Sequence, residues 1–309
     1  MKNLVVLTLG IFTFTTLLFC EPIKPIPHEM KVNPMKAELG KKLFSDPILS
    51  KDGTISCATC HDLQNGGDDG LKFSFGINGQ EGDINSPTVY NAVFNFRQFW
   101  DGRAKDLKEQ ARGPIENPVE MGHTMHAAVE TLKKNKMYVK YFSAIYKEGI
   151  TKDTIADAIA EFEKTLITPN SPFDRYLKGD KDVISQKAKE GYLLFKSKGC
   201  ILCHHGVNVG GNFYNKFGIY EDADTENLGR YSITKREEDK HVFKVPSLRN
   251  IALTAPYMHD GRVSTLTKAV ELMTEYQLGR HMDPGDTEAI VAFLESLTGE
   301  LPAIVRVKQ

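Results

Sequence analysis

The sequence predicts a mainly α-helical protein built from two tandem copies of one small helical unit. Two observations lead to this prediction. Several short segments recur later in the chain in the same order, and apolar residues repeat at helical spacing over much of the remaining sequence. No run alternates between apolar and polar residues for long enough to predict a sizeable sheet.

The recurring segments lie at consistent offsets. Residues 87–91 (PTVYN) recur 159 positions later as residues 246–250 (PSLRN), and residues 101–103 (DGR) recur at the same offset as residues 260–262. Residues 40–44 (GKKLF) match residues 191–195 (GYLLF). Ordered self-similarity of this kind indicates a duplicated unit.

The remaining sequence divides into helices and loops. Helical spacing predicts helices over residues 35–44, 127–148, 152–166, 185–198, 265–276 and 286–297. Residues 64–69 and 206–215 are rich in glycine and asparagine and predict loops. Turn-forming residues at 168–172 (TPNSP) mark a boundary between the copies. We therefore expect an N-terminal domain at 21–170 and a C-terminal domain at 171–297, with the tail 298–309 packing back on the first domain.

A pentapeptide of the pattern C-x-x-C-H occurs in each copy, at residues 57–61 (CATCH) and 200–204 (CILCH). This pattern attaches a c-type haem: the two cysteines add to the haem vinyl groups, and the histidine binds the iron. A redox dithiol would need a βαβ setting, and zinc would need more ligands. Because these motifs use four of the five cysteines, we predict two cytochrome c-like domains, each with one covalent haem c. The predicted attachment residues are Cys57, Cys60 and His61 in the first motif, and Cys200, Cys203 and His204 in the second.

The two haem motifs are offset by 143 positions rather than 159, so the second copy carries extra residues after its haem motif. The charged run at residues 221–240 is the obvious insertion.

Composition and the N-terminus bear on compartment and partners. The chain is 41% hydrophobic and 26% charged with a net charge of −1, and no basic block predicts nucleic acid as a partner. Lys2 precedes an apolar run that is shorter than a membrane span, so residues 1–20 are interpreted as an export signal. Cys20 ends the signal or becomes a lipidated first residue. Because the bulky Phe19 precedes it, we favour a soluble periplasmic protein.

The reaction depends on the second axial position of each iron. A closed pair such as His/Met raises the potential and suits electron transfer, whereas an open position admits a small substrate. Seen alone, Met273 would be interpreted as a core methionine, Glu120 as a solvated carboxylate and Trp100 as a buried core residue.

At this point the chain resembles the bacterial dihaem cytochrome c peroxidases. Besides the haem motifs, the resemblance rests on residues 99–104 (FWDGRA), 117–122 (NPVEMG), 245–250 (VPSLRN), 254–261 (TAPYMHDG) and 277–279 (QLG). It implies reduction of hydrogen peroxide to water, with electrons supplied one at a time by a small soluble cytochrome c or cupredoxin. It also favours a homodimer.

The resemblance assigns roles to individual residues. The C-terminal haem would have Met273 as its distal ligand, with Met258 as the nearest rival. The N-terminal haem would be the peroxidatic one, with Glu120 as the acid/base group, Gln110 as its partner and Trp100 as the bridge between the haems. Asn85, Thr254 and Pro256 match a calcium site, and oxygen donors of this kind suit a hard cation.

One position departs from the family pattern. Many members close the oxidised peroxidatic haem with a histidine at the position held here by Ile77, and isoleucine cannot bind iron. We therefore expect an open or water-bound peroxidatic haem that needs no reductive activation. The alternative is a substitute ligand from His123 or His126, which follow Glu120 closely.

Two other functions remain open from the sequence. The related maturation enzymes of methylamine dehydrogenase oxidise residues of a partner protein and use a tyrosine in place of the methionine ligand. Met273 argues against this function, but Tyr276 lies close by. A dihaem electron carrier without catalysis would leave Glu120, Gln110 and Trp100 without a role.

Overall fold

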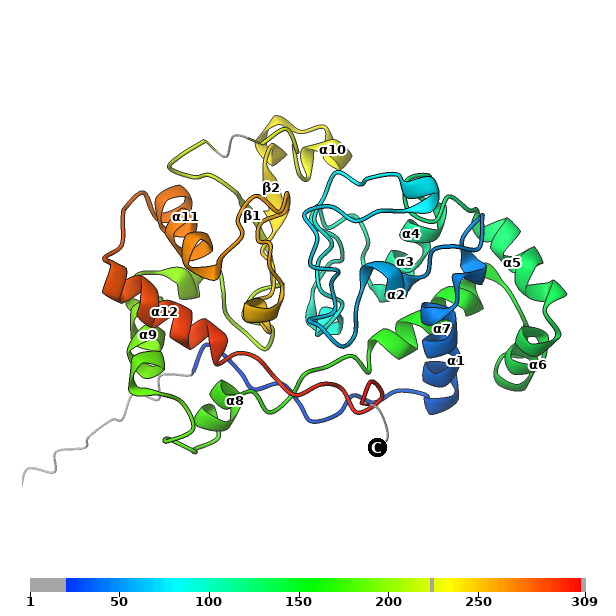
Figure 1. Ribbon diagram of the computed structural model, residues 1–309, viewed down its shortest axis with the longest axis horizontal. Coiled ribbons are helices and arrows are strands. Elements are labelled where there is room, and N and C mark those ends of the chain that lie inside the picture. The colour runs from blue at the N-terminus through cyan, green and yellow to red at the C-terminus, as the bar shows by residue number, and fades with distance from the viewer. Residues whose placement is uncertain (1–20, 223–224, 307–309) are drawn as a thin grey trace, which may run out of the picture.

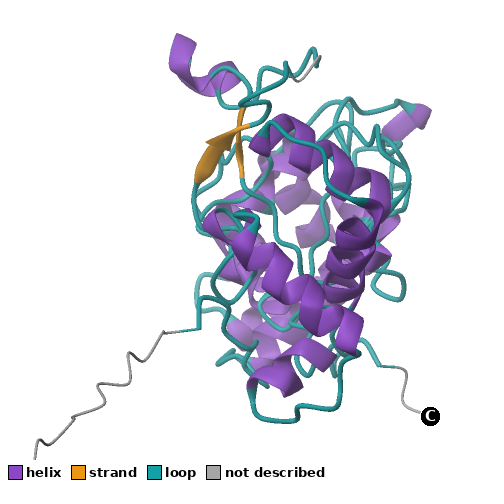
Figure 2. Cartoon of the chain, turned by 90° about the vertical axis from the view of Figure 1, so that its left-hand side faces the viewer, coloured by secondary structure: helices purple, strands orange, loops and turns teal. Residues whose placement is uncertain are grey.

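The computed structural model describes residues 21–222 and 225–306. The expected export signal, including Cys20, lies outside these residues. The mainly α-helical fold is confirmed, and Figure 2 shows helices throughout with one short β-ribbon at the edge of the molecule. Within the described residues, no helix has the length and apolar character required to cross a membrane.

The first repeat forms the right-hand half of the molecule in Figure 1. Its α-helices are α1 (Pro34–Ser45), α2 (Cys57–Cys60), α3 (Leu107–Gln110), α4 (Arg112–Glu116), α5 (Met125–Lys134), α6 (Lys136–Ile145) and α7 (Lys152–Glu163). Single turns of 3-10 helix lie at Pro47–Leu49, Ile77–Gly79 and Ala92–Phe94.

The second repeat forms the left-hand half (Figure 1). Its α-helices are α8 (Pro172–Leu177), α9 (Gln186–Ser197), α10 (Tyr231–Thr234), α11 (Leu266–Leu278) and α12 (Pro284–Glu295). Single 3-10 turns lie at Cys200–Leu202, Glu237–Asp239 and Ile251–Leu253. The strands β1 (Tyr214–Lys216) and β2 (Val242–Lys244) pair antiparallel, with Tyr214 opposite Lys244.

One predicted helix differs from the structure. Residues 127–148 show continuous helical spacing, but the chain breaks at Asn135 into α5 and α6. Asn135 has extended backbone angles (φ −91°, ψ 106°), and its side chain accepts hydrogen bonds from the amides of Met137 and Tyr138. An asparagine side chain that caps a new helix outweighs the continuity of the apolar pattern.

The two halves repeat the same helix packing. Helix α1 packs on α7 in the first half, and α9 packs on α12 in the second. A Cβ atom added to Gly40 would lie 1.9 Å from the carbonyl oxygen of Ala158, and one added to Gly191 would lie 1.8 Å from that of Ala289. Both glycines therefore allow close helix contact, which explains why the repeated GxxxF segment begins with glycine.

Three chain segments cross between the halves along the lower edge of Figure 1. They are residues 21–33, the linker around 164–171 and the C-terminal residues 298–306. Ile23 packs in the core of the second half with Phe173 and Tyr192. Val305 packs in the opposite direction, against Phe44 and Phe162 of the first half. The ends of the described chain therefore fasten each half to the other.

A buried threonine joins the two repeats at the linker. The side-chain amides of Asn91 and Asn250, which hold equivalent places in the repeats, both donate to the Thr168 hydroxyl oxygen, at 2.8 and 2.9 Å. Both asparagine side chains also accept a hydrogen bond from a backbone amide. Asn91 Oδ1 accepts from the Thr168 amide, and Asn250 Oδ1 accepts from the Gly299 amide, each at 2.9 Å. Thr168 therefore joins the equivalent asparagines of the two repeats.

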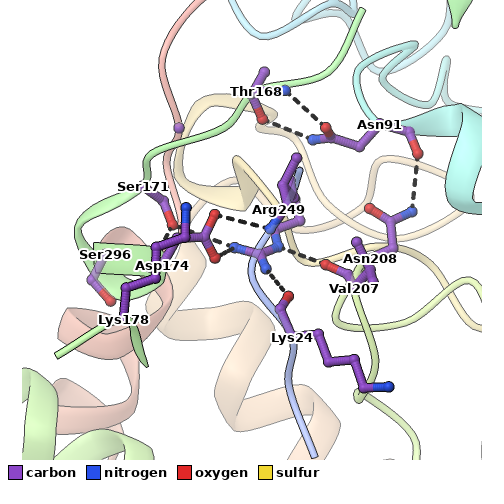
Figure 3. A network of polar contacts seen from close by, with 12 residues as sticks. Lys24, Asn91, Thr168, Ser171, Asp174, Lys178, Val207, Asn208, Arg249 and Ser296 are labelled. Atoms are coloured by element: carbon purple, nitrogen blue, oxygen red, sulfur yellow. Dashed lines mark hydrogen bonds and ion pairs between the residues drawn. The ribbon is translucent and has the colours of Figure 1, made fainter. Parts of the chain in front are cut away.

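A buried ion pair lies beside this centre (Figure 3). Arg249 donates through Nη1 to Asp174 Oδ1 at 2.7 Å, and neither side chain is exposed to solvent. Its other nitrogens donate to the carbonyl oxygens of Lys24 and Val207, at 2.8 and 2.9 Å. One guanidinium thus joins the N-terminal segment, helix α8 and the loop that follows the second haem motif.

We predict that Thr168→Val destabilises the protein by about 1–3 kcal/mol for each buried amide donor that loses its acceptor. Valine has the shape of threonine but cannot accept from Asn91 or Asn250. The midpoint of guanidinium unfolding of the haem-loaded protein measures this loss. Thr168→Ser keeps the hydroxyl and serves as the control. Equal midpoints for the valine and serine variants would contradict the role of Thr168.

Candidate functional site

The two C-x-x-C-H segments occupy single helical turns at the same place in each half. The first forms α2, which ends at His61, and the second forms the 3-10 turn Cys200–Leu202. The cysteines are not joined in disulfides. Burial raises the pKa of the Cys57 thiol to about 12 and that of Cys200 to about 11. These thiols are therefore neutral in the folded chain.

The environment of these thiols does not suit zinc. A zinc site requires thiolates and further ligands in a tetrahedron. In the part of the chain that the structure describes, no three His, Cys, Asp or Glu side chains are grouped so that they could hold a metal ion. Two thiols and one imidazole in apolar surroundings, repeated in each half, fit a covalently attached haem.

The His61 ring is held by a backbone carbonyl and an aromatic neighbour. Its Nδ1 lies 3.1 Å from the carbonyl oxygen of Gly67, and its ring centroid is 6.3 Å from that of Phe44. Burial lowers the pKa of His61, so the imidazole is neutral. A neutral imidazole that donates from Nδ1 to a carbonyl presents Nε2 for a metal.

His204 holds the equivalent position in the second half. Its ring centroid lies 6.3 Å from that of Phe195, which is the repeat equivalent of Phe44. Burial lowers its pKa to about 4, which keeps the imidazole neutral. Unlike His61, its buried Nδ1 has no hydrogen-bond partner within the described residues. Both halves therefore hold a neutral histidine next to two partly buried thiols.

Glu120 lies near the thiols of the first half. Its carboxylate accepts a hydrogen bond from Asn117 Nδ2 at 2.6 Å. Burial raises the pKa of Glu120, and the Asn117 amide and the Arg103 charge act in the opposite direction. The Glu120 charge in turn helps to raise the pKa of Cys57 and of Cys60. The predicted acid/base group and the predicted haem attachment residues are thus close together.

Gln110 is not joined to Glu120 in this structure. It ends α3 and is half-buried, and among the described residues its side chain forms no hydrogen bond.

Ile77 lies directly against the Glu120 loop. Its amide donates to the carbonyl oxygen of Glu120 at 2.8 Å, and its buried side chain faces Gly122. The loop is closed by a bridge between Phe75 and Glu81. Ile77 therefore presents an apolar side chain to the loop that carries the predicted acid/base group.

The two histidines that could replace the missing ligand lie nearby in sequence. His126 is exposed in the first turn of α5, and His123 is half-buried. Burial and the Lys51 charge lower the pKa of His123.

The candidates for the sixth ligand of the second haem share one cluster. Met273, Met258 and Tyr276 all pack against Phe217 and Phe243. The cluster contains both methionines and the tyrosine, so its packing alone does not select among them.

Trp100 and Asn85 lie at the contact between the halves. Trp100 Nε1 donates to the carbonyl oxygen of Asn85 at 2.9 Å. The Asn85 side-chain amide donates to the carbonyl oxygens of Leu71 and Lys72, at 2.8 and 3.3 Å. Asn85 Nδ2 thus donates hydrogen bonds to the protein backbone, whereas Asn85 Oδ1 accepts no hydrogen bond from the described residues.

The other two predicted calcium residues come from the second half. Thr254 and Pro256 follow the 3-10 turn Ile251–Leu253, which lies against the glycine-rich loop of the first half. A Cβ atom on Gly66 would lie 3.0 Å from the carbonyl oxygen of Leu253. The predicted calcium residues thus lie in segments that meet across the interface.

Sequence reasoning missed two buried acids of the first half. Glu163 has one carboxylate oxygen without a hydrogen bond, and burial raises its pKa to about 8. Asp68 also has one unpaired oxygen, and burial raises its pKa to about 7. The duplication could have revealed Glu163. It follows Phe162 in α7, and the equivalent position of the second repeat, after Phe293, is the apolar Leu294.

Comparisons with known proteins identify the family of this chain. A family model described as di-haem cytochrome c peroxidase matches residues 34–182. Cytochrome c551 peroxidase of Nitrosomonas europaea is 50% identical over 285 residues, which cover 91% of this chain and 85% of that protein. Cytochrome c peroxidase Ccp of Escherichia coli is 47% identical over 295 residues, which cover 94% of this chain and 63% of that protein.

A solved structure described as a MauG-like protein associated with microbial copper homeostasis has the same architecture. Its TM-score is 0.79 at 27% identity, and the match covers 94% of this chain and 97% of that one. The resemblance stated from the sequence is confirmed by these matches. The chain belongs to the dihaem cytochrome c peroxidase family.

Proposed function

We propose that this protein reduces hydrogen peroxide to water at the N-terminal haem, with two electrons and two protons consumed per peroxide. The observation that carries this proposal is the asymmetry between the halves. In the first half, the half-buried carboxylate of Glu120 acts on the pKa of both haem-motif thiols, and the apolar Ile77 contacts the Glu120 loop. The second half offers methionines instead. When bound covalently at Cys57 and Cys60, haem supplies an iron that binds peroxide and passes electrons to it.

Glu120 performs the proton transfer. Cleavage of the O–O bond requires a group that takes a proton from the near oxygen and returns it to the far oxygen. Burial raises the pKa of Glu120 towards the working pH, which suits a group that must both accept and donate. Asn117 holds the carboxylate in place through its 2.6 Å hydrogen bond. Gln110 acts as its partner when the site is loaded.

Electrons enter at the C-terminal haem and pass to the N-terminal one. His204 and Met273 would hold the iron of the C-terminal haem, and His/Met ligation would raise its potential so that it could store an electron. Trp100 carries the electron between the halves, a role supported by its place at their interface.

The family resemblance and the sequence also support proposals for the compartment, the electron donor, the oligomeric state and a calcium site. We propose a periplasmic protein that receives electrons from a small soluble cytochrome c or cupredoxin and works as a homodimer. A calcium ion binds between the halves through Asn85, Thr254 and Pro256. The free Oδ1 of Asn85 supports this assignment.

A second function is favoured by one observation, the presence of Tyr276 in the cluster that holds Met273. A tyrosine ligand would fit an enzyme that oxidises residues of a partner protein.

We predict that Met273→Leu lowers the midpoint potential of the C-terminal haem and changes its spectrum, because the His/Met pair is lost. Tyr276→Phe serves as the control and leaves both unchanged. A spectral change only in Tyr276→Phe would favour the second function.

We predict that Glu120→Gln lowers kcat/KM for peroxide by about 10²–10⁴-fold, because glutamine cannot transfer the proton. In the wild type, the rate falls as the pH drops through the raised pKa of Glu120, since the protonated acid cannot accept a proton. The glutamine variant loses this acid limb. Rates measured across pH test this, with Glu81→Gln on the exposed side of the adjoining loop as the control. An unchanged acid limb in Glu120→Gln would exclude Glu120 as the base.

We predict that the fully oxidised wild-type enzyme turns over peroxide as fast as enzyme first reduced by one electron, because Ile77 leaves the first haem open. Ile77→His supplies a ligand on the same loop. The variant should show a low-spin oxidised first haem and turn over peroxide only after reduction. Ile77→Val is the matched control and should behave as the wild type. A wild type that is active only after reduction would show that another group closes the site.

A further inference from the structure

The repeat-equivalent turns of the two halves meet at their interface. Phe99 and Met258 hold the same place in the repeats, and both have left-handed backbones (φ 68° and 74°). Bridges between Gln98 and Ala104 and between Tyr257 and Val263 close the two turns in the same way. The residue that follows in each turn is Trp100 or His259. Two side chains related by the duplication therefore point into one interface.

Trp100 and His259 are in direct contact there. Their ring centroids lie 6.2 Å apart, with the planes at 70°. The Asn85 backbone links the two residues, because its amide donates to the backbone carbonyl oxygen of His259 at 2.8 Å and its carbonyl oxygen accepts from the indole Nε1 of Trp100 at 2.9 Å. The ring contact is thus fixed by hydrogen bonds at both residues.

The other face of His259 lies against the cluster that holds Met273. Its ring stacks on Phe243, with centroids 4.3 Å apart and planes at 24°, and it meets the edge of Phe217 at 5.5 Å. Only 3% of His259 is exposed. Trp100 also packs against the Phe217–Phe243 cluster that holds Met273, and the His259 ring fills the space among Trp100, Phe217 and Phe243.

Residues that only the second repeat possesses hold this arrangement. Thr225, in the insertion 221–240, has its Oγ1 2.9 Å from His259 Nε2. Arg230, in the same insertion, donates to the carbonyl oxygen of Asp101 at 3.2 Å and to the Tyr214 hydroxyl at 2.7 Å. Tyr214 in turn covers Gly102, where a Cβ atom would lie 2.2 Å from the Tyr214 hydroxyl oxygen. The insertion thus holds the Trp100 turn and the His259 ring together.

We propose that His259 is a positioning residue for electron transfer between the haems: it packs the Trp100 indole against the Met273 cluster, and Thr225 sets its ring orientation. This inference rests on the proposed function, because it concerns the path from the C-terminal to the N-terminal haem. Electron tunnelling weakens steeply when packed atoms are replaced by a gap. A buried ring between two aromatic groups keeps that gap filled.

The test compares rates of electron transfer between the haems in the holoenzyme. The C-terminal haem is reduced by rapid mixing, reduction of the N-terminal haem is followed by absorbance, and both midpoint potentials are titrated. His259→Leu should slow the transfer on the order of tenfold or more, since small displacements of reacting groups carry losses of that size. Both potentials should stay as in the wild type. His259→Phe should restore most of the rate, and Thr225→Val should give a smaller loss.

Phe96→Leu is the matched control. Phe96 packs on Tyr214 at the same interface, with ring centroids 4.9 Å apart, and among the described residues no ring contact joins it to Trp100 or His259. It should transfer electrons as the wild type does. A His259→Leu rate within about twofold of the wild type, or a loss that His259→Phe does not restore, overturns the inference. A fully reduced wild type that fails to react with peroxide would instead overturn the proposed function.

Discussion

The buried hydrogen bonds of Thr168 are the constraint on which the rest of the structure depends. One hydroxyl accepts from Asn91 of the first repeat and from Asn250 of the second, so the two halves share a single acceptor. Buried amide donors without an acceptor are costly, and any relative movement of the halves would break one of these bonds. The neighbouring Arg249–Asp174 pair lies within the second half, where it fastens helix α8 and the N-terminal segment, and breaking a buried ion pair costs about 3–5 kcal/mol.

The hydrogen bonds of Thr168 set the relative position of the two halves at their interface. The turns that carry Trp100 and His259 hold equivalent places in the two repeats, and they meet at the interface. The duplication therefore produces the contact between the halves, and the divergence of the two residues gives that contact an indole on one side and an imidazole on the other.

Acids with raised pKa values distinguish the halves within the described residues. Glu120, Glu163 and Asp68 all belong to the first half, and burial raises the pKa of each, whereas the fully buried Asp174 of the second half is paired with Arg249. The second half has the apolar Leu294 at the place of Glu163 and a cluster of methionine and aromatic side chains next to its interface. This division agrees with proton-coupled chemistry in the first half and storage of an electron in the second.

The sequence by itself determined the helical class, the duplication, the two haem motifs and the family, because these depend on local pattern and on residue identity. It could not show that Asn135 divides a helix, because a side-chain cap competes there with a continuous apolar pattern. Nor could it place His259, Thr225 and Arg230 around Trp100, or reveal the burial of Glu163. Those features depend on which residues distant in the chain become neighbours and lose water, and only the packed tertiary structure decides that.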